Sequence, residues 1–292
     1  MSFRTRLRLT SAVVVCLAFT YIVLFNALAL YSLTKSTYTP SSAAVHRAHI
    51  YLAYLGFKSW KCKTPHFSKQ SLPLTALVSF PGSGNTWIRH ILQQATGINT
   101  GSVYRDYILK ILGFPGEGVQ NSSVLVIKTH EWGVNERKKY KRAILVLRNP
   151  KDSLLAEFNR KNGGHIGHAK KEDFKQKWIP YFNDSARYWL YMTKDWLNFT
   201  GDLHILRYER LKTDPINVIK SLLNFLQIHI SEKKLMCVYQ NMNGRFKRPW
   251  KNVTDYDPYS SEMRSVLVQY EQQINELIDH RYRSSFRIRN ST

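Results

Sequence analysis

Hydrophobic and polar positions along residues 74–278 follow two different patterns. Short apolar runs rich in β-branched residues, typical of buried strands, occupy 76–80, 124–128, 143–147 and 203–207. Between and after them, apolar residues recur at helical spacing and predict helices over 85–95, 151–160, about 174–199, 215–227 and 260–278. Strands that alternate with helices are typical of a parallel sheet flanked by helices, so we expect one α/β domain.

Two of the predicted helices have chemically marked beginnings. Asn149 precedes Pro150, and Asp214 precedes Pro215. Each pair places a capping side chain before a proline, whose missing N–H leaves no hydrogen bond unmade in the first turn. We therefore predict that Asn149 and Asp214 cap the helices that follow them.

The N-terminus has a different pattern, a long apolar segment behind a basic tail. Residues 9–33 run for 25 positions without a charge, long enough to span a bilayer and longer than the apolar part of a cleavable signal peptide. Arginines precede this segment and only Lys35 closely follows it. This predicts a cytoplasmic tail over 1–8 and a single-pass type II signal anchor. A short stem over 34–71 and a lumenal domain over 72–292 would follow.

Cysteine and asparagine positions agree with a lumenal domain. Outside the anchor the chain has only Cys62 and Cys237, which we expect to pair in an oxidising compartment, the alternative being two separate buried thiols. Acceptor sites for N-linked glycans begin at Asn121, Asn183, Asn198, Asn252 and Asn290.

The charge of the chain indicates an anionic partner. It has 43 lysines and arginines against 20 aspartates and glutamates, a formal net charge of +23. Such a surplus is typical of proteins that bind nucleic acid, although part of it is ordinary solvated surface. A lumenal domain does not meet nucleic acid. The expected partners are therefore phosphorylated or sulfated cofactors, acidic glycans and lipid headgroups.

A glycine-containing loop, SFPGSGNTW over 79–87, joins the first strand to the first helix. Backbone N–H groups at a helix N-terminus lack partners within the helix, and small residues let an anion approach them. The loop therefore predicts an anion site, although glycine turns also occur in α/β proteins without one. Asn85 stands where a Walker A motif has lysine, which disfavours an ordinary nucleoside triphosphatase or kinase.

Further charged side chains follow at strand ends. Lys128 and His130 are two residues apart, so they share a strand face and point toward the glycine loop at the carboxyl edge of the sheet. Histidine is suited to accept a proton near neutral pH. Arg148, at the end of the third strand, suits a second phosphate, and a basic loop with Arg245 and Lys247 is able to close over a polyanion. Each of these residues, taken alone, has an ordinary structural or surface interpretation.

In this order the motifs resemble the sulfotransferases that use 3'-phosphoadenosine 5'-phosphosulfate (PAPS). SFPGSGNTW resembles their 5'-phosphosulfate loop, and KTH at 128–130 resembles the segment with the catalytic base. LRNPKDS at 147–153 resembles their 3'-phosphate motif, and LRYERLKTDP at 206–215 resembles the strand, loop and helix that follow the long helix. The resemblance implies the sulfotransferase fold, a P-loop-like parallel sheet, and sulfo transfer that requires no metal.

The resemblance also implies roles for individual residues. It implies a phosphosulfate site at Ser83, Gly84, Asn85 and Thr86, an adenine site at Trp87 and Tyr208, a 3'-phosphate site at Arg148, Arg245 and Lys247, and a general base at His130. A leaving phosphate also needs a positive neighbour. We prefer Lys128 for this role because it shares a strand face with His130, and Arg89 in the first helix is the alternative.

Further segments resemble the WSC-domain-containing (WSCD) sulfotransferases; they are TGINTGS (96–102), KTHE (128–131), AEFNRKNGGHIGHA (156–169), RYERL (207–211) and NGRFKR (243–248). This resemblance implies a Golgi enzyme that sulfates sialic acid on glycans, an anionic acceptor that suits the basic surface. Residues 34–71 contain one cysteine and are too short for a WSC module. The chain is therefore expected to resemble these sulfotransferases but to lack their WSC modules.

Two positions depart from the pattern of the wider sulfotransferase family. The lysine usual in the phosphosulfate loop is Gly82 here, and the serine expected eight residues after Arg148 is Ala156. Both departures favour an alternative from another class, a glycan-binding pseudoenzyme with the same fold. Transfer of labelled sulfate from the donor to a sialylated glycan separates the two hypotheses.

Overall fold

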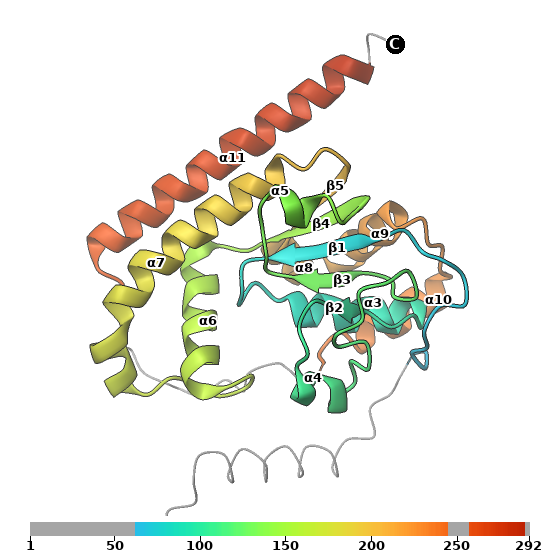
Figure 1. Ribbon diagram of the computed structural model, residues 1–292, viewed down its shortest axis with the longest axis horizontal. Helices are drawn as coiled ribbons and strands as arrows, with labels where there is room; N and C mark the ends of the chain where they lie inside the picture. Colours follow the sequence, from blue (N-terminus) through green and yellow to red (C-terminus); the bar gives the residue numbers. More distant parts are fainter. Residues whose placement is uncertain (1–61, 245–256, 290–292) are drawn as a thin grey trace, which may run out of the picture. The chain divides into compact units, whose positions relative to one another are not determined.

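Five parallel strands form the sheet that the alternating pattern predicts (Figure 1). The computed structural model describes residues 62–244 and 257–289. The sheet order is β2-β3-β1-β4-β5, with β1 (Thr75–Ser79), β2 (Gly101–Ser102), β3 (Ile127–Thr129), β4 (Arg142–Leu147) and β5 (Asp202–Arg207). Because every neighbouring pair is parallel, the loops after β1, β3 and β4 leave the sheet at one edge. Ligands of open parallel sheets bind at this carboxyl edge.

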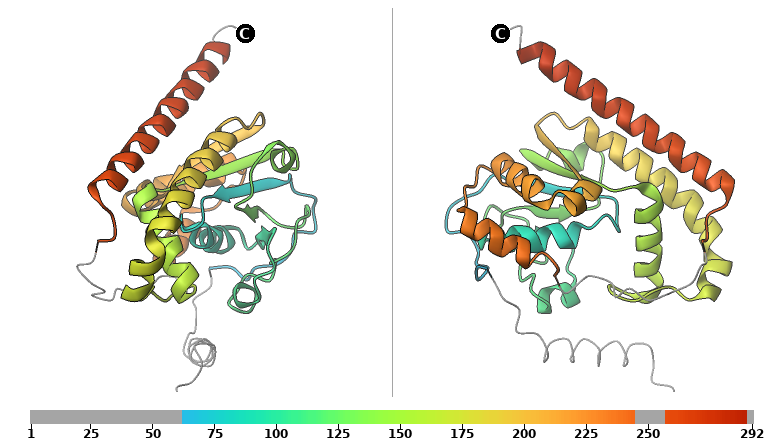
Figure 2. Two further views of the ribbon diagram at one scale, coloured as in Figure 1. Left: turned by 60° about the vertical axis from the view of Figure 1, so that its left-hand side comes forward. Right: turned by 180° about the vertical axis from the view of Figure 1, so that it is seen from behind.

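Helices cover both faces of the sheet (Figures 1 and 2). Their bounds are α3 (Asn85–Thr96), α4 (Tyr107–Ile111), α5 (Val134–Arg137), α6 (Pro150–Gly163), α7 (Lys171–Leu197), α8 (Tyr208–Thr213), α9 (Pro215–Phe225), α10 (Glu232–Gln240) and α11 (Ser261–Arg289). Side chains of α6, α7 and α11 pack on one face, and those of α3, α9 and α10 pack on the other. This confirms the predicted α/β architecture.

Side chains of the central strands alternate between two hydrophobic cores. Ala76 and Val78 of β1 belong to the core that contains the tryptophans of α7, whereas Leu77 belongs to the core beneath α3. In β4, Leu145 and Ile144 divide in the same way. Neighbouring strand residues point to opposite faces, and both faces are covered, so these strands have continuous apolar sequences.

The second predicted strand begins later than expected. The prediction covered 124–128, but β3 contains only Ile127–Thr129. Leu125 is buried, and its backbone N–H donates to the Asn99 carbonyl over 2.9 Å. The start of this apolar run therefore fixes the loop before β2 and takes no part in the ladder with β1. An apolar run alone does not distinguish these two environments.

One of the two predicted helix caps is confirmed and the other is wrong. The Asn149 side chain accepts a hydrogen bond from the Lys151 backbone N–H over 3.0 Å, as expected of a cap. Asp214 makes no such bond. Its carboxylate accepts from Asn217 Nδ2 over 3.0 Å and lies 3.6 Å from Arg210. These side chains compete with the backbone for the carboxylate.

Several predicted features lie outside the described residues. They are the tail, the anchor at 9–33, the stem up to residue 61, Arg245, Lys247, Asn252 and Asn290. Within residues 62–244 and 257–289, no helix combines the length and the hydrophobicity that a membrane span requires.

A disulfide bond joins Cys62, which precedes β1, to Cys237 on α10. The two cysteines are 175 positions apart in the sequence. The ammonium group of Lys234, also on α10, donates a hydrogen bond to the Cys62 carbonyl. Together these contacts fix the segment before the sheet to the helix layer on one face.

We expect Cys237→Ala to lower the free energy of unfolding by about 2–5 kcal/mol, because the disulfide restricts the unfolded chain. Denaturant unfolding without reductant measures this change. Met236→Ala replaces an exposed neighbour on the same helix and serves as the control. It should change stability by less than about 0.5 kcal/mol. Complete alkylation of both cysteines in the denatured, unreduced chain would contradict the bond.

Candidate functional site

The loop between β1 and α3 presents hydrogen-bond donors without partners. Gly84, at φ 89°, precedes α3 in a left-handed conformation, and no side chain of the described residues caps this helix. The first turn of α3 also contains no acidic residue. Within the described part of the chain, the buried hydroxyl of Ser83 has no hydrogen-bond partner. An uncapped helix N-terminus beside a lone hydroxyl is suited to hold an anion.

Two glycines allow neighbouring elements to pack closely on this loop. A Cβ atom at Gly82 would lie 2.4 Å from the Ser153 carbonyl oxygen and 2.8 Å from the Glu157 backbone nitrogen, both on α6. A Cβ atom at Gly84 would lie 2.6 Å from the Tyr208 ring. The backbone of α6 thus occupies the space that a side chain at position 82 would need. Close packing against α6 therefore explains why residue 82 is a glycine. The positive charge near the loop must come from other residues.

The other loop residues have different surroundings. Asn85 Nδ2 donates to the Leu77 carbonyl over 2.9 Å and to Ser79 Oγ over 3.2 Å. This amide nitrogen therefore braces β1 and is not available to a ligand. Thr86 is half-buried and occupies the second position of α3.

Arg148 lies between the glycine loop and Tyr208. Its Nη1 donates to the Gly82 carbonyl over 2.8 Å, and its guanidinium carbon lies 4.4 Å from the centre of the Tyr208 ring. Its Nε is buried and has no partner among the described residues. A guanidinium fixed in this way, with a donor to spare, is suited to bind phosphate.

The Tyr208 ring beside Arg148 also contacts a second aromatic ring. Trp87 packs edge-on against Tyr208, with 5.4 Å between ring centres, and its Nε1 donates to the Met242 carbonyl over 2.8 Å. The structure thus brings Trp87, Tyr208, Arg148 and the glycine loop together, although they come from three separate motifs. Adjacent aromatic side chains of this kind suit a planar base.

His130 directly follows β3, and its ring bonds to β1. Its Nδ1 lies 2.6 Å from the Ser79 carbonyl oxygen. A carbonyl only accepts hydrogen bonds, so Nδ1 carries the proton and Nε2 of the neutral ring has a free lone pair. Burial and the positive charge of Lys128 lower the pKa of His130 to about 3. The ring is therefore neutral at physiological pH, and Nε2 is able to accept a proton.

Lys128 lies close to His130, as their spacing predicts. Its Nζ is 5.5 Å from the centre of the Tyr104 ring, which also stacks on His130. Burial and the positive charge of Arg89 lower the pKa of Lys128 to about 8. Lys128 is thus mostly protonated at neutral pH, and no carboxylate of the described residues forms a salt bridge with it.

Arg89, the alternative cation, is fully buried. Its Nη1 lies 2.5 Å from Glu117, and its Nε donates to the Thr100 hydroxyl over 2.9 Å. The structure therefore buries Arg89 away from solvent and pairs its charge with Glu117, beside Thr100 at the start of the edge strand β2. Lys128 is the better placed of the two cations to act beside His130.

Helix α7 fixes the turn after His130, which the sequence analysis did not predict. The Tyr188 hydroxyl donates to the His130 carbonyl, and Trp196 Nε1 donates to the Glu131 carbonyl over 3.0 Å. The Asp195 carboxylate accepts from the Gly133 backbone N–H over 2.8 Å. These contacts join residues 58 to 65 positions apart, and no local motif marks them.

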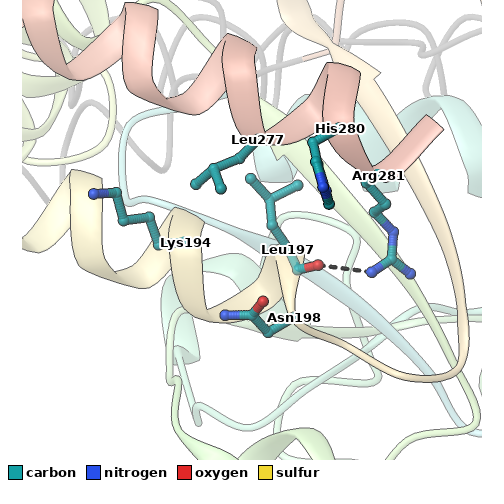
Figure 3. Close-up of a pocket in the computed structure, with 6 residues that line it drawn as sticks. All are labelled: Lys194, Leu197, Asn198, Leu277, His280 and Arg281. Atoms are coloured by element: carbon teal, nitrogen blue, oxygen red, sulfur yellow. Dashed lines mark hydrogen bonds between the residues drawn. The ribbon is translucent and has the colours of Figure 1, made fainter. Parts of the chain in front are cut away.

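A pocket of about 420 Å³ lies between the end of α7 and α11 (Figure 3). It is lined by Lys194, Leu197, Asn198, Leu277, His280 and Arg281. Arg281 donates to the Leu197 carbonyl over 2.7 Å, so part of this lining is engaged in joining the two helices. No residue of the glycine loop and neither Lys128 nor His130 lines it, so it is separate from the candidate site.

Three of the predicted glycan acceptors lie on the described surface. Asn121 is exposed in the loop before β3, Asn183 is exposed on α7, and Asn198 is exposed at the end of that helix. The structure thus presents each of these side chains to solvent, and their glycosylation stays a prediction.

Known proteins match the part of the chain that contains this site. A family profile described as the sulfotransferase domain matches residues 73–249. The sequence is 46% identical over 204 residues to WSCD family member CG9164 of Drosophila melanogaster. It is 43% identical over 205 residues to WSCD family member AAEL009094 of Aedes aegypti. Each match covers 68% of this chain and 64% of the relative, so the chain spans just under two thirds of these curated relatives.

A crystal structure of mouse sulfotransferase SULT7A1 complexed with PAP matches with 16% sequence identity and a TM-score of 0.43. The match covers 74% of this chain and 86% of the mouse chain.

We expect Lys128→Met to raise the pKa of His130, because the substitution removes a positive charge that disfavours the protonated ring. An NMR titration of the histidine ring signals measures this change. Lys110→Met removes an exposed charge from α4 and is the control, which should leave the pKa of His130 unchanged. An unchanged pKa in Lys128→Met would show that the two side chains are not electrostatically linked.

Proposed function

Because the chain belongs to the sulfotransferase family, we propose that it transfers a sulfo group from PAPS to a hydroxyl group of a glycan, with sialic acid as the acceptor sugar. The observation that carries this proposal is the placement of His130. Its ring is neutral, its Nδ1 proton is engaged by Ser79, and it lies one strand away from a loop with unpaired donors. The net charge of +23 and the similarity to WSCD family members support an acidic glycan as acceptor.

The described residues are suited to hold the donor. The Ser83 hydroxyl and the uncapped N-terminus of α3 would bind the phosphosulfate, and Arg148 would bind the 3'-phosphate with its spare Nε donor. Trp87 and Tyr208 would contact the adenine. Arg245 and Lys247, which lie outside the described residues, would complete the 3'-phosphate site. PAPS supplies the sulfo group, and its bisphosphate product is PAP.

His130 would act as the general base. Its Nε2 takes the proton of the acceptor hydroxyl while the hydroxyl oxygen forms a bond to sulfur. The bond between sulfur and the phosphate oxygen breaks, and the phosphate keeps the bonding electrons. Lys128 and the N–H groups at the start of α3 stabilise the negative charge that develops on this phosphate oxygen. The scheme uses no metal ion.

We further propose that the protein is a single-pass type II protein of the Golgi membrane with its catalytic domain in the lumen. The uncharged segment at 9–33 supports an anchor. The disulfide between Cys62 and Cys237 and the exposed glycan acceptors on the described surface support an oxidising, glycosylating compartment.

A glycan-binding pseudoenzyme is the second candidate. Gly82 and Ala156 favour it, since the family pattern has a lysine and a serine at these positions. The close contact of Gly82 with α6 weakens this alternative, because a packing requirement explains the missing lysine.

The decisive experiment measures the transfer of labelled sulfate from PAPS to a sialylated glycan, with the same glycan after sialidase treatment as a control. We expect label only on the sialylated glycan. His130→Ala and Lys128→Ala should each lower kcat by about 10² or more. Binding of PAP without labelling of either glycan would support the pseudoenzyme. Equal labelling of both glycans would contradict sialic acid as the acceptor.

Arg148→Ala should weaken the binding of PAP by roughly 10- to 150-fold, because it removes a charged hydrogen-bond donor. Titration calorimetry measures the dissociation constants. The matched control is Lys151→Ala, since Lys151 is a nearby cation that already pairs with Asp257 at 3.2 Å. Equal losses in both variants would indicate a general charge effect and would contradict a specific role for Arg148.

A further inference from the structure

Tyr104 belongs to none of the motifs above, yet it contacts both reactive side chains of the site. Its hydroxyl accepts a hydrogen bond from the His130 backbone N–H over 3.0 Å. Its ring stacks on the imidazole of His130, with 5.6 Å between ring centres and 27° between planes. On the same ring, Lys128 Nζ lies 5.5 Å from the centre.

We propose that Tyr104 is a positioning residue that holds the base and the cation of the site in one arrangement. The proposal rests on the proposed function for the chemistry of His130 and Lys128. The contacts of Tyr104 with His130 and Lys128 involve no substrate, so they can be tested without sulfo transfer.

The hydroxyl of Tyr104 fixes the backbone of His130. It donates to the Glu131 carboxylate over 2.8 Å, and an ionised carboxylate only accepts hydrogen bonds. The lone pairs of the hydroxyl are therefore left to accept from the His130 N–H. Burial and the hydrogen bond with Glu131 raise the pKa of Tyr104 well above its usual value, so it remains protonated. Tyr104 thus orients His130 and does not itself take a proton.

The ring of Tyr104 acts on both side chains. The face of an aromatic ring attracts a cation, which favours the charged form of Lys128 against the effect of burial. Stacking restricts the rotation of the imidazole, whose Nδ1 is already bound by Ser79. The lone pair on Nε2 then points in one direction, as general base catalysis requires.

The sheet determines where this ring lies. The Tyr104 backbone N–H donates to Ser102 Oγ of β2 over 3.1 Å, and the Val103 N–H donates to the Lys128 carbonyl over 3.0 Å. Tyr104 is therefore carried by the backbone contacts that also hold Lys128. A short strand that the sequence pattern did not predict thus places the residue between the two reactive groups.

Two substitutions at Tyr104 distinguish the contribution of its hydroxyl from that of its ring. Tyr104→Phe removes only the hydroxyl and should lower kcat for sulfo transfer by roughly 3- to 10-fold, the effect of one hydrogen bond. Tyr104→Leu also removes the ring and should lower kcat further. In Tyr104→Leu the loss of rate at alkaline pH should begin at lower pH, because Lys128 loses the ring that favours its charge. In Tyr104→Phe this part of the pH profile should stay near that of the wild type.

Several other charged groups act on Lys128, and both variants retain them. They are Arg89 of α3, Glu117 and Asp106 on either side of α4, and Arg160 of α6. The difference between the leucine and phenylalanine variants therefore measures the effect of the Tyr104 ring on Lys128. Tyr107→Phe and Tyr107→Leu alter a 74% exposed tyrosine three residues away and serve as matched controls. These controls should leave kcat and its pH dependence unchanged.

A second measurement needs neither PAPS nor an acceptor. NMR titration of labelled lysine should show a lower pKa for Lys128 in Tyr104→Leu than in the wild type, and little change in Tyr104→Phe. If the wild type transfers no sulfo group, the proposed function fails and this titration still tests the contact. Normal kcat and an unchanged pH profile in Tyr104→Leu would overturn the positioning role and leave the proposed function intact. If Tyr104→Leu does not fold, a normal kcat in Tyr104→Phe would overturn the role of the hydroxyl.

Discussion

The hydrogen bond from the Nδ1–H of His130 to the Ser79 carbonyl, 2.6 Å long, is the contact on which the chemistry of the site depends. It exists because β1 and β3 are parallel neighbours with Val78 opposite Thr129, so that Ser79 and His130 follow in register at one edge of the sheet. With the proton fixed on Nδ1, Nε2 has the free lone pair. Ser79 also begins the loop that we propose binds the anionic donor. One strand pair therefore positions both the proposed proton acceptor and this loop.

Electrostatics adds a second constraint. The acidic residues of this region are engaged with other partners, Glu117 with Arg89 and Glu157 with Arg160. None of the described carboxylates forms a salt bridge with Lys128, although the charges of Glu117 and Asp106 favour its protonated form. Burial and the charge of Lys128 together keep the pKa of His130 at about 3. A negative charge bound in the loop would offset this effect and raise the pKa of His130. We therefore expect His130 to be a weak base in the free protein and to become a stronger base when an anionic donor is bound.

The sequence was sufficient to predict the layered sheet, because the strands are apolar on both faces and the helices have clear spacing. It was also sufficient to group Lys128 with His130, since positions two apart share a strand face. It was not sufficient for contacts that depend on tertiary packing. Arg89 is buried and paired with Glu117, and neither property can be predicted from the local sequence pattern. The contacts of Tyr104 and of α7 join segments that are distant in sequence.

The protonation state of the His130 ring tests this arrangement most directly. Nitrogen chemical shifts of the two ring atoms, assigned with a His130→Gln variant, distinguish a protonated from an unprotonated nitrogen. We predict a protonated Nδ1 and an unprotonated Nε2 at neutral pH, because the Ser79 carbonyl requires a donor. A protonated Nε2 with an unprotonated Nδ1 would contradict the hydrogen bond to Ser79 and leave His130 without a free lone pair for the acceptor hydroxyl.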